Sequence, residues 1–401
     1  MDINPRVLSL RNERGVKEEL RKIGVSREGE KILSQKTHLY LIKLEGISSQ
    51  AANLLKQEML SVSGDAAIKR EVVAFTTSRS DVLLIGTQAQ YKRILPRLRR
   101  QPFNLSILSD KIEEALKNFK RENFILSFKD SSLDLTKKVA VMGILNITPD
   151  SFYDGGKYTQ EKEALRRVEE MISQGADIID VGGESTRPGA KRVDLEEEIR
   201  RIIPVIERIK ALFQVPISVD TYKAGVAKKA IEAGADMVND ISGLRFDEKL
   251  PETIAKYEVP LVVMHIKGTP RNMQDNPYYD SLMGEIISYL AQSIRLAEEA
   301  GVDKEKIILD PGIGFGKTTE HNLEIINRLS ELRSLGRPIL IGVSRKSFIG
   351  NVLNLPLKER LEGSLAAVSL AVSQGARIIR THDIKEARRA VDLTGAVINE
   401  P

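Results

Sequence analysis

Polar and charged side chains directly follow eight short apolar runs of the sequence. The runs are residues 139–145, 177–181, 217–219, 236–238, 261–264, 307–309, 339–341 and 377–379. They are followed by Asn146, Glu184 to Arg187, Asp220, Asn239 with Asp240, His265, Asp310, Ser344 to Lys346, and Arg380 with His382. Carboxylate, amide and guanidinium groups in such a set bind polar ligands and stabilise charge in a transition state. Helix caps and turns explain any one position equally well, but all eight together indicate a site.

Two of these positions carry a dense set of hydrogen-bond donors. Arg345, Lys346 and Ser347 follow the seventh run, and Arg380 and His382 follow the eighth. Guanidinium and ammonium groups form strong, charge-assisted hydrogen bonds with phosphate oxygens. The alternative interpretation is a solvated basic loop. We favour an anion site, because both groups follow consecutive apolar runs.

The glycine-rich stretch 310–318 reads DPGIGFGKT and ends like a nucleotide-binding P-loop. The P-loop spacing requires glycine at position 311, which is Pro311, so we reject that interpretation. Glycines still allow the backbone to approach a flat ligand or an anion closely. Asp310 heads the stretch, and an ionised carboxylate accepts two hydrogen bonds from a planar, amidine-like heterocycle.

The residue inventory excludes several classes of site. The chain has no cysteine, which excludes disulfides, zinc–thiolate sites, iron–sulfur clusters and cysteine nucleophiles. It has four histidines: His38 and His321 stand in no motif, and His265 fits a satisfied buried histidine as well as a ligand contact. A metal would therefore be a hard, oxygen-bound cation such as magnesium.

The eight apolar runs alternate with segments that have helical spacing. These segments are residues 163–174, 195–212, 223–233, 281–300, 322–335 and 362–374. Glycines at 175, 234, 301 and 375 fit left-handed helix ends that lead directly into the next run. The alternation predicts a TIM (β/α)8 barrel over residues 135–401, with its chemistry at the carboxyl ends of the strands. A dinucleotide-binding sheet would need a glycine fingerprint after its first strand, and that fingerprint is missing.

Residues 1–134 predict a small α/β domain of unknown role, joined to the barrel by a polar linker over 128–138. The basic stretch 91–100, YKRILPRLRR, favours a solvated helix face over a nucleic-acid patch, and we expect no nucleic-acid partner. The N-terminus lacks the apolar core of a signal peptide, and no apolar run approaches membrane-spanning length. We therefore expect a cytoplasmic protein without a membrane partner.

Eight motifs, in this order, resemble the signature set of the dihydropteroate synthase family of the folate pathway. They are MGILNITPDSFYDGG, DVGGESTRPGA, SVDTYK, VNDISG, VVMHIKGTP, ILDPGIGFGK, GVSRKSFIG and RTHD. The resemblance begins at residue 139 and does not extend to the N-terminal region. It implies that 6-hydroxymethyl-7,8-dihydropterin pyrophosphate condenses with 4-aminobenzoate to give 7,8-dihydropteroate and pyrophosphate, by an SN1-like loss of pyrophosphate. It also implies a homodimer and a sulfonamide target.

The resemblance assigns roles to particular residues. The catalytic residues it implies are Asp220, Asp310 and Lys346. The implied pterin contacts are Asp220, Asn239, Asp310 and Lys346. The implied pyrophosphate contacts are Asn146, Arg187, Arg380 and His382, with Mg²⁺ at Asn146. The implied 4-aminobenzoate pocket contains Phe152, Thr186, Arg187, Pro188, Phe315 and Ser347.

Two positions depart from the commonest family pattern. Thr381 stands where valine is usual, and Lys267 stands where glutamine is common. Two other functions remain alternatives. A pterin-binding methyltransferase would share the pterin contacts but has no use for the pyrophosphate donors Arg380 and His382. A non-catalytic pterin-binding scaffold would not need polar residues at every strand end.

Overall fold

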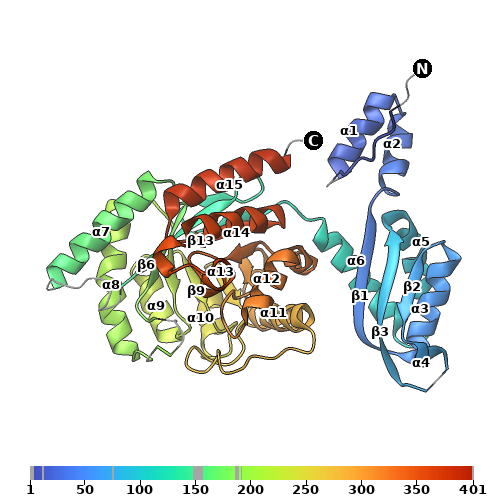
Figure 1. Cartoon of the computed structure of the whole chain (residues 1–401). Helices are drawn as coiled ribbons and strands as arrows, with labels where there is room; N and C mark the ends of the chain where they lie inside the picture. Colours follow the sequence, from blue (N-terminus) through green and yellow to red (C-terminus); the bar gives the residue numbers. More distant parts are fainter. Residues whose placement is uncertain are drawn as a thin grey trace. The chain divides into compact units, whose positions relative to one another are not determined.

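The computed structural model describes residues 4–10, 13–74, 76–147, 157–185, 189–190 and 192–399, without the side chains of 157–160 and 399. The chain forms two compact units, one ending at Lys117 and one of residues 118–399 (Figure 1). Within the described residues, no helix is both long and apolar enough to cross a membrane.

The N-terminal unit is a small α/β domain, as predicted. Its strands are β1 (Leu39–Ser48), β2 (Asp65–Ile68) and β3 (Arg79–Thr87), and its helices are α1 (Glu13–Ile23), α2 (Arg27–Ser34), α3 (Ser49–Ser61), α4 (Arg70–Val73), α5 (Gln88–Leu98) and α6 (Leu105–Phe119). The antiparallel sheet has the order β1-β3-β2. Apolar residues of α3, α5, α6 and one sheet face form its core.

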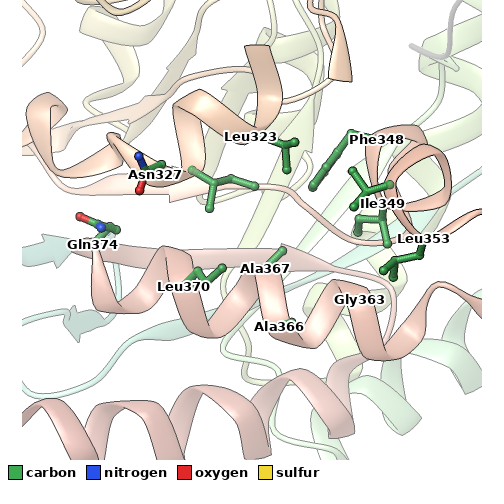
Figure 2. Close-up of a pocket in the computed structure, with 12 residues that line it drawn as sticks. Leu323, Asn327, Phe348, Ile349, Leu353, Gly363, Ala366, Ala367, Leu370 and Gln374 are labelled. Carbon is green, nitrogen blue, oxygen red and sulfur yellow. The ribbon is translucent and has the colours of Figure 1, made fainter. Parts of the chain in front are cut away.

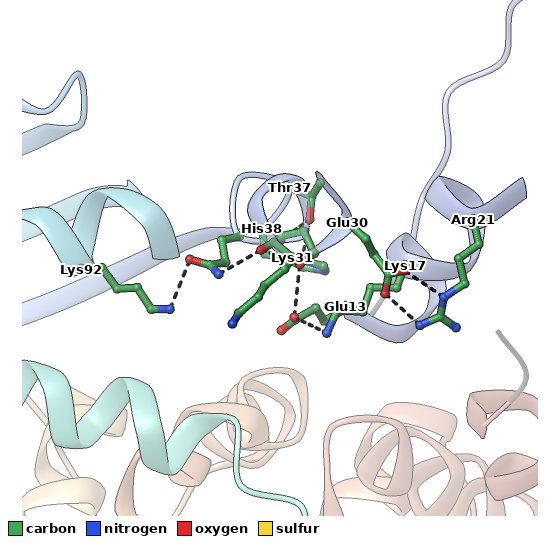
Figure 3. Close-up of polar contacts among 10 residues, drawn as sticks. Glu13, Lys17, Arg21, Glu30, Lys31, Thr37, His38 and Lys92 are labelled. Atoms are coloured by element: carbon green, nitrogen blue, oxygen red, sulfur yellow. Dashed lines mark hydrogen bonds and ion pairs between the residues drawn. The ribbon is translucent and has the colours of Figure 1, made fainter. Parts of the chain in front are cut away.

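Ion pairs and hydrogen bonds hold the α1–α2 hairpin of this unit (Figure 3). Arg21 of α1 donates two hydrogen bonds of 2.9 and 2.8 Å to the carboxylate of Glu30 in α2. Lys92 of α5 donates to the side chain of Gln35, just after α2, at 3.2 Å. The basic residues of α5, including Lys92 and Arg93, lie on its exposed face. These contacts stabilise the packing of α1 on α2, and the basic residues of α5 form the exposed face of that helix.

The C-terminal unit confirms the predicted TIM barrel. Eight parallel strands close the barrel: β6 (Ala140–Asn146), β7 (Ile178–Gly182), β8 (Ile217–Asp220), β9 (Met237–Asp240), β10 (Leu261–Met264), β11 (Ile307–Asp310), β12 (Ile339–Ile341) and β13 (Ala376–Thr381). The surrounding helices are α7 (Lys157–Ser173), α8 (Leu195–Leu212), α9 (Ala224–Glu232), α10 (Leu250–Tyr257), α11 (Leu282–Glu299), α12 (Thr319–Asn327), α13 (Ser347–Leu353), α14 (Leu361–Ser373) and α15 (Ile384–Asn399). The four glycines predicted to end helices all have positive φ.

The predicted linker at 128–138 is wrong. Strands β4 (Ile125–Ser127) and β5 (Ser132–Asp134) form a hairpin of the C-terminal unit. Its apolar residues Leu126 and Phe128 are buried against the first residues of the barrel strands, such as Ile178. The unit therefore begins earlier than residue 135, because polar residues between the buried ones concealed the hairpin in the sequence. The single helix predicted at 322–335 is also two elements, α12 and a 3₁₀ segment (Leu329–Leu335).

Candidate active site

Four residues predicted to bind one ligand come together at the carboxyl ends of the barrel strands. Asp220, Asn239 and Asp310 lie at the ends of β8, β9 and β11, and all three are buried. Lys346 follows β12 and interacts electrostatically with both aspartates. The parallel barrel brings these residues together because every β-strand delivers its last residue to the same end.

An arginine links three of the strands across the site. The Arg380 side chain, on β13, donates from Nε to Asp180 on β7 and from Nη2 to Asp220 on β8, both at 2.6 Å. Asn239 donates to the same oxygen of Asp180 at 3.1 Å. Asp180 is fully buried, and its Oδ1 has no hydrogen-bond partner among the described residues. An unsatisfied buried acceptor is costly, which indicates that water or a ligand supplies a donor.

Sequence reasoning missed Asp180. The signal was present, because Asp180 is the one charged residue inside the apolar strand segment Ile178–Gly182. Alternation along a strand places every second side chain on the interior of a barrel, so a charged residue there needs a partner. The partner, Arg380, is 200 positions further along the chain.

Burial shapes the electrostatics of the site. It raises the pKa of Asp220, although Arg380 acts in the opposite direction. Burial also raises the pKa of Asp310, opposed by the Gly312 N–H, which donates to it at 2.7 Å, and by Lys346. Burial lowers the pKa of Lys346 to about 8, and the two aspartates oppose this shift. The opposite charges therefore compensate one another in a site that disfavours any isolated charge.

The glycine-rich loop after β11 packs closely on the loop after β10. Gly312 and Gly316 have φ of 70° and 66°. A Cβ on Gly312 would lie 1.9 Å from the carbonyl oxygen of His265, and a Cβ on Gly316 would lie 2.5 Å from that of Lys267. Only glycine fits both positions. The loop places the ring of Phe315 4.6 Å from the ammonium nitrogen of Lys346.

His265 is a buried histidine whose ring has a hydrogen-bond partner. This is one of the two interpretations that the sequence left open. The Lys317 ammonium lies 2.9 Å from His265 Nδ1 and donates to the Phe315 carbonyl at 3.0 Å. Burial lowers the pKa of His265 to about 2, helped by Lys317, so its ring is neutral. Burial also lowers the pKa of Lys317 to about 7, which Asp310 opposes. The sequence interpretation considered Lys317 only as a P-loop lysine and missed this structural role.

The predicted anion donors have different surroundings. Arg345 is engaged elsewhere, since its guanidinium binds both carboxylate oxygens of Asp383 at 2.9 and 2.8 Å. Its role as an anion donor stays a prediction. Ser347 is exposed at the start of α13, and the backbone N–H of His382 donates to Ser344 at 3.3 Å.

Asn146 lies at the end of β6 and pairs with Gly182 of β7. A Cβ on Gly182 would be 3.7 Å from Asn146 Oδ1 and 3.7 Å from Asp220 Oδ2, so these oxygens flank the space left by the missing side chain. Among the described residues, no group of three or more His, Cys, Asp or Glu side chains could hold a metal ion.

Four predicted site residues lie outside the described residues: Phe152, Thr186, Arg187 and Pro188. Their predicted places in the site remain predictions.

Comparison with known proteins agrees with this geometry. A family model described as "Pterin binding enzyme" matches residues 142–382. Dihydropteroate synthase of Bacillus subtilis is 49% identical over 276 residues, which is 69% of this chain and 94% of the relative. The crystal structure of Yersinia pestis dihydropteroate synthase with a sulfonamide drug complex aligns with a TM-score of 0.65 and 45% identity, covering 68% of this chain and 99% of that one.

A third relative extends the likeness beyond the barrel. A probable bifunctional folylpolyglutamate synthase/dihydropteroate synthase of Halobacterium salinarum is 41% identical over 350 residues, 87% of this chain and 42% of the relative. That alignment is longer than the unit of residues 118–399, so it includes part of the N-terminal unit. Together these matches show that the chain belongs to the dihydropteroate synthase family of pterin-binding transferases.

Proposed function

We propose that this chain condenses 6-hydroxymethyl-7,8-dihydropterin pyrophosphate with 4-aminobenzoate, giving 7,8-dihydropteroate and pyrophosphate. The observation that carries the proposal is the buried set of Asp220, Asn239 and Asp310 at the carboxyl end of the barrel, with Lys346 interacting electrostatically with both aspartates. The pterin ring has an amidine-like edge of N–H donors, and buried carboxylates are acceptors for it. The alignments cover 94% and 96% of two relatives that are named dihydropteroate synthase.

The pyrophosphate group would lie at Asn146, Arg380 and His382, together with Arg187. Mg²⁺ would bind the amide oxygen of Asn146 as one ligand. Magnesium commonly keeps several waters and binds one or two protein oxygens plus substrate phosphates. When bound, it would supply positive charge to the leaving group.

The chemical step would be dissociative. The bond between the pterin methylene carbon and the pyrophosphate oxygen breaks, and the electron pair leaves with pyrophosphate. Asp220 and Asp310 stabilise the positive charge delocalised into the pterin, while Arg380 stabilises the leaving group. The neutral amine of 4-aminobenzoate then forms the C–N bond and loses a proton, so no strong base is required. Its pocket would contain Phe315 and Ser347, with Phe152, Thr186, Arg187 and Pro188.

The direct test follows both products of the purified chain. Dihydropteroate formation and pyrophosphate release should be equal, should require both substrates, and should be inhibited competitively against 4-aminobenzoate by a sulfonamide. Oxygen-18 placed in the bridging position of the pterin substrate should scramble on the enzyme before the amine is added, as expected for a dissociative step. A chain that binds pterin but releases no pyrophosphate would instead be the scaffold, and methyl transfer would identify the other alternative.

We also propose that the chain is a homodimer formed through α12, α13 and α14. These helices border an apolar cleft of about 320 Å³ (Figure 2). Leu353 and Leu370, 49% and 57% exposed, lie along it. An exposed apolar patch of this kind marks an interaction surface. Light scattering should give twice the chain mass, and Leu370→Lys should give the monomer mass; a wild-type monomer at micromolar concentration would overturn the proposal.

The cytoplasmic location stays a prediction, tested by cell fractionation.

A further inference from the structure

Arg345 has an unusual backbone conformation next to the site. Its φ is 51°, in the left-handed region that residues other than glycine rarely adopt. Its backbone N–H donates to Ser364 Oγ at 2.9 Å, and its carbonyl oxygen accepts from Arg360 at 3.3 Å. Both partners lie at the start of α14. Backbone strain of this kind persists only where surrounding contacts hold it, and it is concentrated at functional sites.

The side chain of Arg345 binds Asp383, two positions after β13 ends. Its Nε and Nη2 donate to the two carboxylate oxygens of Asp383 at 2.9 and 2.8 Å. Its Nη1 donates to the carbonyl oxygens of Leu357 and Lys358 at 3.4 and 3.2 Å. A bidentate contact between arginine and carboxylate fixes orientation as well as distance. Four contacts for five N–H groups leave little capacity for a direct phosphate contact.

The ion pair joins two loops at positions adjacent to predicted ligand contacts. Arg345 directly precedes Lys346, and Asp383 directly follows His382. The loops are connected a second time, since the backbone N–H of His382 donates to Ser344 Oγ at 3.3 Å. Two contacts therefore link the loop after β12 to the loop after β13 beside the site.

The backbone turn at Arg345 also decides where Lys346 points. The Lys346 ammonium lies 4.6 Å from the centre of the Phe315 ring and interacts electrostatically with Asp220 and Asp310. Because the left-handed φ stands one residue earlier, a change of conformation at Arg345 would redirect the chain that carries Lys346 into this set.

Stability alone is a weak explanation of the ion pair. The side chains of Arg345 and Asp383 are 27% and 17% exposed. Ion pairs that solvent reaches contribute little to stability, because water screens them. The strained φ of Arg345 offsets part of any gain. The fixed separation of the two loops is the stronger explanation.

We propose that Arg345 and Asp383 are positioning residues for the pterin pyrophosphate. This inference rests on the proposed function, in which Lys346 contacts the pterin and His382 contacts the pyrophosphate group. Arg345 and Asp383 contact neither substrate. Their ion pair fixes the separation of Lys346 and His382, so that both side chains meet one substrate molecule with the correct geometry.

The test is a double-mutant cycle of Arg345→Met and Asp383→Asn. Each variant should lower kcat/KM for the pterin pyrophosphate roughly ten- to a hundredfold, the scale of effect that a small misplacement of reacting groups produces. The double variant should lose no more than either single variant, because both substitutions remove the same contact. Arg345→Lys, which keeps the charge but not the bidentate contact, should recover part of the loss.

Product inhibition by inorganic pyrophosphate separates positioning from direct anion binding by Arg345. If the ion pair positions His382, Arg345→Met and Asp383→Asn should raise the inhibition constant by similar factors. If Arg345 binds the anion itself, Asp383→Asn frees the guanidinium and should lower that constant or leave it unchanged. That result would overturn the proposal.

Arg388→Met is the matched control. Arg388 of α15 pairs with Asp177 at 3.2 Å and donates to the carbonyl oxygen of Val139 at 3.0 Å. Both partners directly precede barrel strands, so this ion pair lies at the opposite end of the barrel from the site. The variant should lower the melting temperature and leave kcat/KM and pyrophosphate inhibition unchanged.

The remaining outcomes are distinguishable. Additive losses in the double variant, or a lower melting temperature with unchanged kinetics, would overturn the positioning role. If Arg345→Met does not fold, Asp383→Asn keeps the side-chain volume and tests the role through kcat/KM and the inhibition constant. A wild-type chain that forms no dihydropteroate would instead defeat the proposed function, before any variant is compared.

Discussion

The two units bury different kinds of polar group. In the N-terminal unit, most buried polar residues are serines whose hydroxyls donate to backbone carbonyls. Ser49 donates to Thr77 at 2.5 Å and Ser109 to Leu95 at 2.9 Å. In the barrel, the buried polar groups include many ionisable side chains. Their members near the strand ends are Asp180, Asp220, Asp240, His265, Asp310 and Lys317.

This difference separates polar groups that support a fold from groups that serve a site. A neutral hydroxyl that returns a backbone hydrogen bond costs little to bury, whereas an ionised group costs several kcal/mol unless it is paired. Burial of charge alone is not sufficient to mark a site. Asp236 is buried at the other end of the barrel, but it accepts from Lys210 and from the N–H of Ile217, and it links adjacent elements. The site is distinguished by charges that converge from several strands and by the unsatisfied oxygen of Asp180.

The largest change in kcat/KM is expected for Asp310→Asn. It should lower kcat/KM roughly hundred- to ten-thousandfold, because hydrogen bonds to a charged acceptor contribute about 1.5–3 kcal/mol each and the pterin edge offers two. Stability should be unchanged or higher, because burial disfavours the charged carboxylate. Steady-state kinetics and thermal unfolding measure the two effects.

Ser109→Ala is the counterpart in the N-terminal unit. It should lower stability by about 1 kcal/mol without changing kcat/KM, since it removes one buried hydrogen bond. Equal losses of activity in the two variants would end the distinction between the two kinds of buried group.

The second expected effect concerns Lys346. Burial lowers its pKa to about 8, so its ammonium loses its proton as pH rises through that value. If the ammonium binds the pterin, kcat/KM should fall up to tenfold per pH unit above pH 8. Lys346→Arg stays protonated and should lack this alkaline limb, although with lower activity. A limb of equal position in Lys346→Arg would assign the ionisation to another group.

The sequence predicted those parts of the molecule that depend on local patterns. The alternation of apolar runs with helical segments, and the glycines that end those helices, predicted the barrel. The polar residues after the apolar runs predicted that Asp220, Asn239 and Asp310 lie at the carboxyl ends of strands. Contacts between distant positions were not predictable in this way. The role of Asp180 depends on its contact with Arg380, because the closed barrel brings these two distant strands together.

The smallest expected effect is on the pH dependence of stability. His265 has a folded-state pKa of about 2 against an ordinary value of 6.5, because burial excludes the charged ring. As pH falls below 6.5, the unfolded chain binds a proton at this position and the folded chain does not. Stability is therefore lost between pH 6.5 and about 2, by up to about 1.4 kcal/mol per pH unit from this residue.

His265→Gln should remove that contribution. Between pH 6 and pH 5, urea unfolding of the variant should depend less on pH than wild type by about 1 kcal/mol, whatever the variant's stability at pH 7. Identical slopes in wild type and His265→Gln would mean that the buried ring accepts a proton in the folded barrel. The assignment of a neutral His265 beside Lys317 would then be wrong, and the difference between the ionisable groups buried in the barrel and the serines buried in the N-terminal unit would be weaker.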